Sequence, residues 1–510
     1  MTTPGDHGRT VPGCEVPGTS AIVEDMTEES IRNHIAVVGG GIAGLTAAYY
    51  AAKLGARVTL LEGAAGIGGK LQVSEIAGLP VDEGAEAMLA RRPEGLELVR
   101  ELGLGDRLIF PGTTSAAIWS RGALHDLPAG HVMGVPADLV ALARSRVLSP
   151  AGLARVPLDL IRPETPRGED VSVAGFLGAR VGSEVVDRLV EPLLGGVYAG
   201  RGEELSFEAT MPGLAAASRS RRSVIAAARA MREAAPAEAG PVFTTLTGGL
   251  GALPQALAEK FTELGGAVRT GAMVRELHRT PGGWRLSVGP TRHPEYLDAD
   301  AVIVAVPAKP AQRLLKDEVP VAAAELGRIE YASMAIITLA YAGTAFPKWP
   351  RRSGYLVPAV EAGAVKAVTF STTKWPNLAE GSPGTVVVRC SIGRHGDQHL
   401  LQRPDDELKA MAMTELARTS GVIELPIDAR VTRWGGGLPQ YMVGHLDRIA
   451  RIRAAVAGRP GLAVCGAAYD GLGIPACVAT ARVAAARVLE HLNGQGESKR
   501  ADAPVSERRR

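Results

Sequence analysis

The chain has 510 residues, which is more than one hydrophobic core normally organises, so at least two domains are expected. Hydrophobic residues make up 46% of the chain and charged residues 22%, as in ordinary globular proteins. The net charge is only +2, from 56 basic and 54 acidic residues, so the composition supplies no concentrated basic face and argues against nucleic acid as a partner.

The cysteines and the first residues of the chain further restrict the class of protein and its expected location. The four cysteines are scattered, with no spacing suited to zinc, so we expect neither a disulfide framework nor a metal site. The first residues lack the basic start and apolar core of a secretory signal, and no apolar run reaches the roughly 18 residues that span a bilayer. We expect a cytoplasmic protein, and peripheral membrane contact through an amphipathic helix stays open.

The first structured unit follows a polar extension over residues 1–33 that we expect to be disordered. "IAVVGG" reads as a short buried strand, "IAGLTAAYYAAKLG" as a helix that ends at Gly55, and "RVTLLE" as a second strand. Together they predict a βαβ unit.

The pattern becomes helical over residues 91–235, where apolar residues recur at three- and four-residue spacing. Strand patterns return later and predict a sheet over residues 309–424. The last unit is again strand, glycine turn and helix, with Pro475 in the first helical turn, and we expect a disordered tail over residues 493–510. The prediction is an α/β fold with a mixed-sheet domain, a helix-rich insertion and a discontinuous Rossmann-like domain over residues 34–90, 236–308 and 425–492.

Gly39, Gly41 and Gly44 form a G-x-G-x-x-G motif between the first strand and the first helix. In such a motif the first glycine permits the tight turn, the second lets the backbone approach a pyrophosphate, and the third allows close packing of helix on strand. The helix N-terminus then points free N–H groups at the phosphates. Glu62 ends the next strand, where its carboxylate can accept hydrogen bonds from a ribose. A dinucleotide site is predicted, but the motif does not choose between NAD and FAD.

The next two segments, "GAAGIGGKLQ" and "VDEGAEAM", resemble the second glycine motif and the flavin-side loop of the FAD-dependent amine oxidase and porphyrinogen oxidase superfamily. Gly68 and Gly69 allow a second close approach of the backbone to the cofactor, and Lys70 can neutralise phosphate charge. The resemblance favours FAD and makes the Rossmann-like domain the FAD-binding domain.

Further segments resemble the protoporphyrinogen and coproporphyrinogen oxidases of the Gram-positive and actinobacterial type, and they extend from Ile35 to about Leu492. They include "DRLVEPLLGGVYAG", "FTTLTGGLGALPQAL", "PQYMVGH" and "GAAYDGLGIPACVATARVAA". The resemblance implies an oxygen-dependent FAD enzyme of haem biosynthesis. It would remove six electrons from coproporphyrinogen III in three two-electron steps, forming coproporphyrin III and releasing hydrogen peroxide.

Three alternatives stay open. Protoporphyrinogen IX is the alternative substrate, and the two porphyrinogens differ in their number of carboxylates. A flavin amine oxidase or a carotenoid desaturase would use the same fold for other chemistry. A non-enzymatic binding protein, similar to the Rab GDP-dissociation inhibitors, would need no dinucleotide, and the glycine motif with Glu62 argues against it.

The resemblance also assigns cofactor-binding roles by position. The ADP half of FAD would be held by Gly39, Gly40, Gly41, Ile42, Ala43, Gly44, Glu62, Gly69 and Lys70. The loop beside the flavin would be Gly84, Ala85, Glu86 and Ala87. Many relatives have Gly-Pro in this loop, whereas this chain has Gly-Ala-Glu, which puts a negative charge near the ring. Further contacts are expected from Val274, Trp434, Leu472, Gly473 and Ile474.

On the substrate side, porphyrinogen propionates need cations, preferably the planar fork of arginine. Arg92, and after it Arg91, follow the flavin loop close to where the family places a basic residue for a propionate, and Tyr198 is expected on the cavity wall. Lys374 is a candidate cation beside the flavin, although the flavin itself carries the chemistry. Besides the porphyrinogen and oxygen, a transient contact with ferrochelatase is expected because porphyrins are reactive and poorly soluble.

Overall fold

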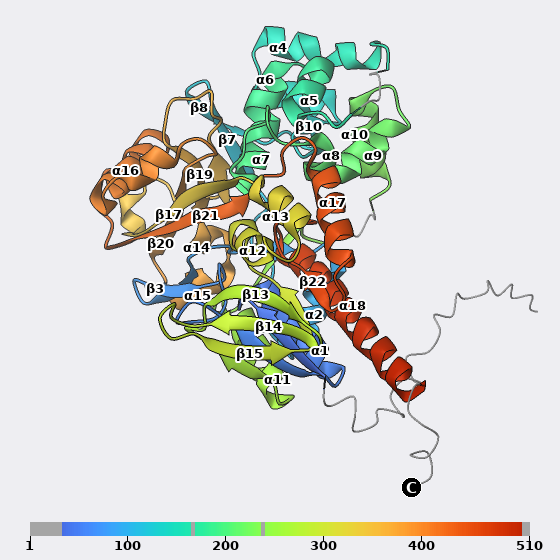
Figure 1. Ribbon diagram of the computed structural model, residues 1–510. Coiled ribbons are helices and arrows are strands. Elements are labelled where there is room, and N and C mark those ends of the chain that lie inside the picture. The colour runs from blue at the N-terminus through green and yellow to red at the C-terminus, as the bar shows by residue number, and fades with distance from the viewer. Residues whose placement is uncertain (1–32, 165–168, 236–239, 502–510) are drawn as a thin grey trace, which may run out of the picture.

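The structure is a computed structural model that describes residues 33–164, 169–235 and 240–501. In Figure 1 the helix-rich part lies at the top, a seven-stranded sheet at the left and a parallel sheet at the base. The predicted disordered ends fall mostly outside the described residues, in 1–32 and 502–510. Helix α18 (Ile474–Ala501) continues past residue 492, where the sequence pattern placed its end.

A five-stranded sheet in the order β12-β2-β1-β16-β22 forms the base, and every adjacent pair in it is parallel. Its inner strands are continuous apolar runs because both faces of the sheet are covered. One face packs against α1, α11 and α18, and the other against the antiparallel sheet β13-β14-β15 and helices α12, α13 and α17. This is the predicted Rossmann-like architecture, and the first and last units of the chain meet in it.

The bounds of the strands in these two sheets are β1 His34–Val38, β2 Arg57–Leu61, β12 Ala267–Arg269, β13 Val274–Thr280, β14 Gly283–Val288, β15 Glu295–Ala299, β16 Ala301–Val304 and β22 Leu462–Val464. The helices that cover them are α1 Ile42–Lys53, α11 Ala252–Glu263, α12 Ala308–Leu315, α13 Pro320–Gly327 and α17 His445–Ala457.

A seven-stranded mixed sheet in the order β21-β17-β20-β19-β18-β7-β8 forms the second layer, with one parallel pair, β18 with β7. Its strands are β7 Ala116–Ser120, β8 Ala123–Asp126, β17 Tyr331–Ala342, β18 Gly354–Leu356, β19 Val365–Phe370, β20 Thr385–Ile392 and β21 Asp428–Pro439. One face carries an apolar core beneath helix α16 (Asp405–Ser420). The short helices α14 (Ser371–Lys374) and α15 (Pro376–Gly381) connect β19 to β20.

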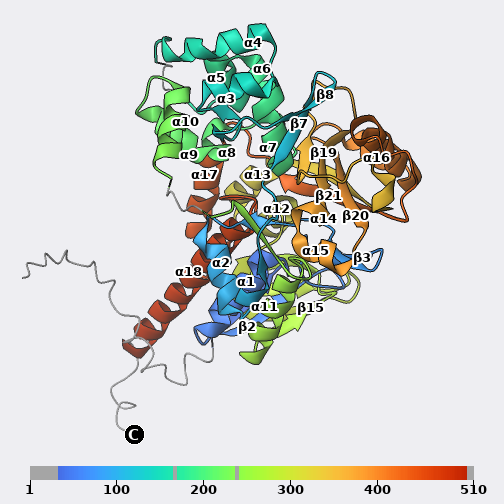
Figure 2. The same cartoon turned by 180° about the vertical axis from the view of Figure 1, so that it is seen from behind.

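The helix-rich part packs around a third apolar core, and Figure 2 shows it from behind. Several of its helices begin at a Ser or Asp whose side chain accepts a backbone N–H of the first turn, which is why they start where they do. Its helices are α3 Leu139–Ser145, α4 Pro150–Arg155, α5 Val173–Val181, α6 Ser183–Val185, α7 Glu191–Tyr198, α8 Phe207–Thr210, α9 Pro212–Arg219 and α10 Val224–Glu233.

Short elements join the layers. They are α2 Pro93–Glu101, the pair β3 Val73–Ile76 with β4 Leu79–Asp82, the pair β9 His131–Val132 with β10 Val135–Pro136, and the sheet of β5 Met88–Leu89, β11 Phe243–Leu246 and β6 Leu108–Ile109. The chain passes between layers repeatedly: β7 and β8 come from residues 91–235 and β21 comes from residues 425–492, yet all three belong to the seven-stranded sheet. The predicted domain boundaries stay a prediction.

Candidate active site

The first glycine loop lies between the carboxyl end of β1 and the start of α1, at the sheet edge where folds of this type bind ligands. Gly39 has φ +111°, a conformation that favours glycine. A Cβ atom on Gly44 would lie 1.8 Å from the carbonyl oxygen of Gly39, so no side chain fits between helix and strand. A Cβ atom on Gly41 would meet nothing within 4 Å. The three glycines have the turn, approach and packing geometry that the motif predicts.

The second glycine loop lies directly against the first. The N–H of Gly68 donates to the carbonyl of Gly40 at 2.8 Å, and Gly41 and Gly68 form a parallel bridge. Gly69 has φ +58°, and a Cβ atom on it would lie 3.2 Å from the Cα of Gly41. Two stretches of backbone without side chains therefore face the same space, which leaves room for a ligand to approach both.

Glu62 lies at the end of β2, beside the first loop. One of its carboxylate oxygens accepts the N–H of Gly40 at 2.6 Å, and the other accepts the N–H of Ala64 at 2.7 Å. The backbone of Ala272 donates to the Glu62 carbonyl at 2.8 Å, so the chain just before β13 lies at the same edge. Val274, the first residue of β13, has its side chain in the core between the sheets.

Lys70 supplies a cation next to these loops. Its side chain forms no ion pair or hydrogen bond with the described part of the chain, and burial lowers its pKa, while the Cys477 thiol in the first turn of α18 acts in the opposite direction. This site fits the phosphates of a dinucleotide. The lysine supplies positive charge, the N-terminus of α1 supplies N–H donors, and the open space at Gly41 lets a phosphate approach the backbone.

Residues 84–87, the predicted flavin loop, are held between the second glycine loop and strand β21. A Cβ atom on Gly84 would lie 2.2 Å from the carbonyl oxygen of Lys70, so only glycine allows this crossing. The indole N–H of Trp434 donates to the carbonyl of Glu83 at 2.9 Å. The structure thus brings together three segments that are far apart in sequence.

Glu86 is the charged centre of this loop. Its carboxylate accepts hydrogen bonds from Lys374 at 2.7 Å, Arg389 at 2.6 Å and the hydroxyl of Ser371 at 3.3 Å, while Arg389 also donates to the carbonyl of Gly84 at 2.6 Å. Burial alone would raise the pKa of Glu86, but the two cations outweigh it and lower the pKa to about 2.

This pairing modifies two expectations. The negative charge of Glu86 does not stand free near the cofactor, because Lys374 and Arg389 neutralise it. Lys374 in turn is an ion-pair partner and not a free cation. Sequence reasoning missed Arg389, although a charge inside the apolar run "VVVRCSIG" of a buried strand was the signal for it.

Leu472, Gly473 and Ile474 lie where they were expected, at the start of the long helix α18. The helix begins at Ile474, and the N–H of Cys477 donates to the carbonyl of Gly473 at 3.0 Å, which closes the first turn. Leu472 packs at the edge of the helix-rich core. The N-terminus of α18 therefore meets both the helix-rich part and the side chain of Lys70.

Tyr441 connects this helix start to the predicted cavity wall. Its hydroxyl donates to the carbonyl of Ala467 at 2.7 Å and accepts the N–H of Gly471 at 2.7 Å. Its ring stacks on His445 with centroids 3.9 Å apart and lies 5.6 Å from the ring of Tyr198. Burial raises the pKa of Tyr198 to about 12, so this phenol stays neutral. Tyr198 thus lies one ring away from the loop that precedes α18.

The sheet face opposite α16 carries mostly small and polar side chains near Arg389. One row in register across three strands is Thr338, Arg389 and Thr369, and the next is Ile336, Ser391 and Ala367. The alternate residues point into the apolar core on the other face. Helix α7 contacts β18 and β19, and a Cβ atom on its Gly195 would meet nothing within 4 Å. Sheet, α7 and flavin loop together can enclose a flat ligand.

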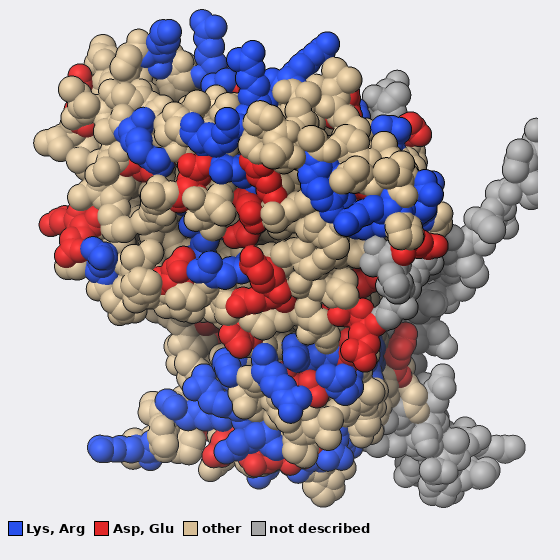
Figure 3. All heavy atoms as spheres, turned by 90° about the horizontal axis from the view of Figure 1, so that it is seen from above, with Lys and Arg blue, Asp and Glu red and all other residues tan. Residues whose placement is uncertain are grey.

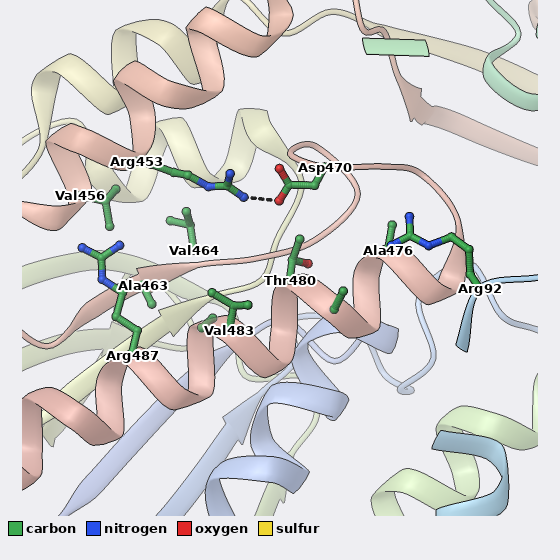
Figure 4. Close-up of a pocket in the computed structure, with 12 residues that line it drawn as sticks. Arg92, Arg453, Val456, Ala463, Val464, Asp470, Ala476, Thr480, Val483 and Arg487 are labelled. Carbon is green, nitrogen blue, oxygen red and sulfur yellow. Dashed lines mark hydrogen bonds and ion pairs between the residues drawn. The ribbon is translucent and has the colours of Figure 1, made fainter. Parts of the chain in front are cut away.

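Arg92 and Arg91 lie at the start of α2. Arg92 pairs with Glu94 at 2.6 Å, and it forms one end of a pocket of about 270 Å³ between α17 and α18 (Figure 4). An Arg453–Asp470 ion pair crosses this pocket. Arg91 reaches only the carbonyl of Gly240, at 3.5 Å. That Arg91 and Arg92 bind a propionate stays a prediction.

The charge on the surface is mixed, as the composition suggested. On the face shown in Figure 3, basic side chains lie in several groups with acidic side chains between them. No helix among the described residues is long and apolar enough to cross a membrane. Within the same residues, no group of three His, Cys, Asp or Glu side chains could hold a metal ion.

The two glycine loops are in contact at the edge of a parallel sheet, beside a lysine that has no partner among the described residues and beside two helix N-termini. This geometry defines a dinucleotide-binding protein of the α/β class. The sequence model of the flavin containing amine oxidoreductases matches residues 42–489, and that of the pyridine nucleotide-disulphide oxidoreductases matches residues 4–78. The chain belongs to the flavin containing amine oxidoreductase family. This confirms the predicted enzyme class and its cofactor, FAD.

Individual relatives agree with this assignment over their whole length. The chain is 40% identical to the coproporphyrinogen III oxidase of Mycobacterium tuberculosis (strain ATCC 25618 / H37Rv), over 90% of this chain and 98% of that protein. It is 31% identical to the coproporphyrinogen III oxidase of Bacillus subtilis (strain 168), over 90% and 99%. A crystal structure described as a putative protoporphyrinogen oxidase from Exiguobacterium superposes with a TM-score of 0.78 at 31% identity, over 90% and 99%. The predicted resemblance to porphyrinogen oxidases is confirmed.

Proposed function

We propose that this protein oxidises coproporphyrinogen III to coproporphyrin III, with FAD as cofactor and oxygen as electron acceptor. The reaction removes six electrons and six protons from the macrocycle, so three molecules of oxygen become three molecules of hydrogen peroxide. The observation that carries the proposal is the match along nearly the whole chain to relatives with this name.

The residues that would hold FAD are those of the two glycine loops, Glu62 and Lys70, with residues 84–87 beside the flavin. FAD held there would supply the two-electron redox chemistry, with oxygen as the final acceptor. The chain's own task is to fix the loop and exclude water from it. Glu86 fixes the loop by holding Lys374 and Arg389 in two ion pairs, and the three side chains are only 13%, 17% and 7% exposed, respectively.

The substrate would lie between this loop, the polar face of the seven-stranded sheet and helix α7. Thr369 and Ala367 are less buried than the alternate residues Val368 and Phe370, which supports a space on this side of β19. Tyr198 would line that space as a neutral aromatic wall, on which a flat macrocycle can stack. No nucleophilic side chain is required, because the cofactor carries the chemistry.

The remaining assignments are part of the same proposal. The Rossmann-like part over residues 34–90, 236–308 and 425–492 binds the cofactor. Residues 91–235 and 309–424 form the substrate side, and strand β21 completes its sheet. A cytoplasmic location and peripheral membrane contact are proposals that rest on the sequence pattern alone. Transient transfer of product to ferrochelatase is supported by the chemistry of porphyrins, which are poorly soluble and reactive.

The test is anaerobic mixing of the purified yellow protein with coproporphyrinogen III or with protoporphyrinogen IX. Flavin absorbance is followed first, and porphyrin fluorescence and peroxide are followed after air is admitted. Faster bleaching by coproporphyrinogen, with coproporphyrin and peroxide as products, supports the proposal. Protoporphyrinogen IX is the second candidate because the Exiguobacterium structure is described as a putative oxidase of that compound. If neither compound bleaches the flavin, the proposal is wrong.

A further inference from the structure

A narrow pocket lined by ionisable side chains lies between helix α7 and the middle of the seven-stranded sheet, where β19 begins and β20 ends. Lys366 of β19, Arg394 just after β20, and Glu191 at the start of α7 line it, together with Gly195 and Gly200. All three charged residues are buried, with 4%, 8% and 7% of their surfaces exposed, respectively. Figure 2 shows α7 beside β19, and the two elements are in contact.

Within the part of the chain that the structure describes, Lys366 has no partner for its charge. Its ammonium group is fully buried and forms no hydrogen bond. Burial, together with the nearby Arg394, lowers the pKa of Lys366 to about 7, and Asp397 acts in the opposite direction. A buried cation without a counterion normally destabilises a fold, so its presence calls for an explanation.

No carboxylate among the described residues forms an ion pair with Lys366 or Arg394. Arg394 donates to the carbonyl of Val357 at 2.7 Å and forms no ion pair with the described residues. Burial raises the pKa of Glu191 to about 7, with a contribution from the repulsion of Glu203, so Glu191 is a poor counterion near neutral pH. Arg394 and, below about pH 7, Lys366 face the pocket as cations. Asp397 raises the pKa of both, but its carboxylate is already paired with Arg201 at 2.9 Å.

A local irregularity of the sheet places Lys366 in this position. The pairing of β19 with β20 shifts between Val365 and Ala367, and Lys366 is the extra residue of this bulge. Bulges of this kind re-aim a side chain and are common beside active sites. Ser391, which pairs with Ala367, has a buried hydroxyl that also lacks a partner.

The cluster lies on the same sheet as Arg389, which binds the flavin loop. Arg389 pairs with Thr369, and Lys366 comes three residues earlier on β19. At about 3.3 Å per residue the separation along the strand is about 10 Å. A flat ligand placed at the flavin loop would therefore extend its side chains towards Lys366. The pocket has no room for a water molecule in this structure, so a carboxylate enters only when α7 or the side chains around Lys366 move apart.

We infer that Lys366 and Arg394 form a binding site for one carboxylate of the substrate, on the side of the macrocycle remote from the flavin loop. This inference rests on the proposed function, which supplies the carboxylate. Lys366 is a specificity-determining residue in this scheme: it recognises the propionate and takes no part in electron transfer. The carboxylate completes an ion pair that the free protein lacks.

The test uses Lys366→Met, which removes the charge at similar length, and Lys366→Arg, which retains it. The control is Lys348→Met, which removes a charge from an exposed loop residue. The measurements are kcat and KM for coproporphyrinogen III, and the Kd of coproporphyrin III and of its tetramethyl ester by fluorescence. Thermal unfolding of each protein is measured without substrate.

For Lys366→Met we expect KM and the Kd of the free acid to rise about ten-fold or more, the usual effect of losing a charged hydrogen bond, while kcat changes little. The Kd of the ester should not change, and the midpoint of thermal unfolding should stay the same or rise because a buried charge is gone. Lys366→Arg should retain much of the affinity, and Lys348→Met should match the wild type.

The result that overturns this inference alone is an active wild-type protein whose KM and Kd values are unaffected by Lys366→Met. A lower unfolding midpoint with unchanged affinity would likewise assign Lys366 a structural role only. If the wild-type protein neither oxidises a porphyrinogen nor binds coproporphyrin, the proposed function fails, and this inference fails with it.

Discussion

The ion pairs of Glu86 offer a direct test of how the flavin loop is held. In Glu86→Gln the loop keeps its shape, but Lys374 and Arg389 lose their shared counterion inside the protein. The usual pKa of a glutamate is 4.5 and that of Glu86 is about 2. At about 1.4 kcal/mol for each tenfold change in proton affinity, the paired charge contributes about 3 kcal/mol to stability at pH 7.

The sign of the pH dependence follows from the lowered pKa of Glu86. The carboxylate is ionised in the folded protein well below the pH at which it takes up a proton in the unfolded chain. Its contribution is therefore complete above about pH 4.5 and is lost as the pH falls towards 2. The difference between wild type and Glu86→Gln should shrink to about 1 kcal/mol at pH 3.

The assay is urea denaturation followed by far-ultraviolet circular dichroism, at pH 7 and at pH 3. The matched control is Glu83→Gln, three positions earlier in the same loop. Glu83 pairs with Arg430 at 3.0 Å, but the two side chains are 23% and 41% exposed, so solvent screens the pair. This control should cost less than about 1 kcal/mol. Equal costs for both variants, or no cost for Glu86→Gln at pH 7, would refute the reasoning.

The glycines of the first loop should separate into two kinds. Gly44→Ala should lower the unfolding midpoint even without FAD, because the new Cβ would lie 1.8 Å from a carbonyl oxygen. Gly41→Ala should leave the stability of the apoprotein unchanged but abolish the flavin absorbance of the purified protein. The opposite pattern would contradict the assignment of Gly41 to the cofactor. Tyr441→Phe leaves a carbonyl and an N–H without their partner and should cost about 1–3 kcal/mol in urea denaturation. Tyr469→Phe, which removes a buried hydroxyl that has no partner, should cost nothing, and equal losses would argue against the bridging role. Trp434→Phe removes the bond to the flavin loop and should raise the Kd of FAD several-fold by titration, and an unchanged Kd would separate this residue from the site.

Several features could be predicted because they depend on neighbours in the chain. The turn at Gly39, the helix α1 and the strand that ends at Glu62 follow from a local pattern of apolar residues and glycines, and the structure shows each of them. The start of α18 likewise follows from a glycine turn and from Pro475 in the first helical turn. The flavin class also followed from sequence, since it depends on short motifs in a set order.

What the tertiary structure decided concerns charges whose partners lie far away in the chain. Glu86 meets Lys374 and Arg389 across 288 and 303 positions, and no local pattern reveals such pairs. The sequence by itself determined the dinucleotide fold, because hydrophobic periodicity and glycine spacing are local properties. Only the packing of the sheet against α7 decided that Lys366 lies buried without a partner, because burial and pairing depend on every element that surrounds a side chain.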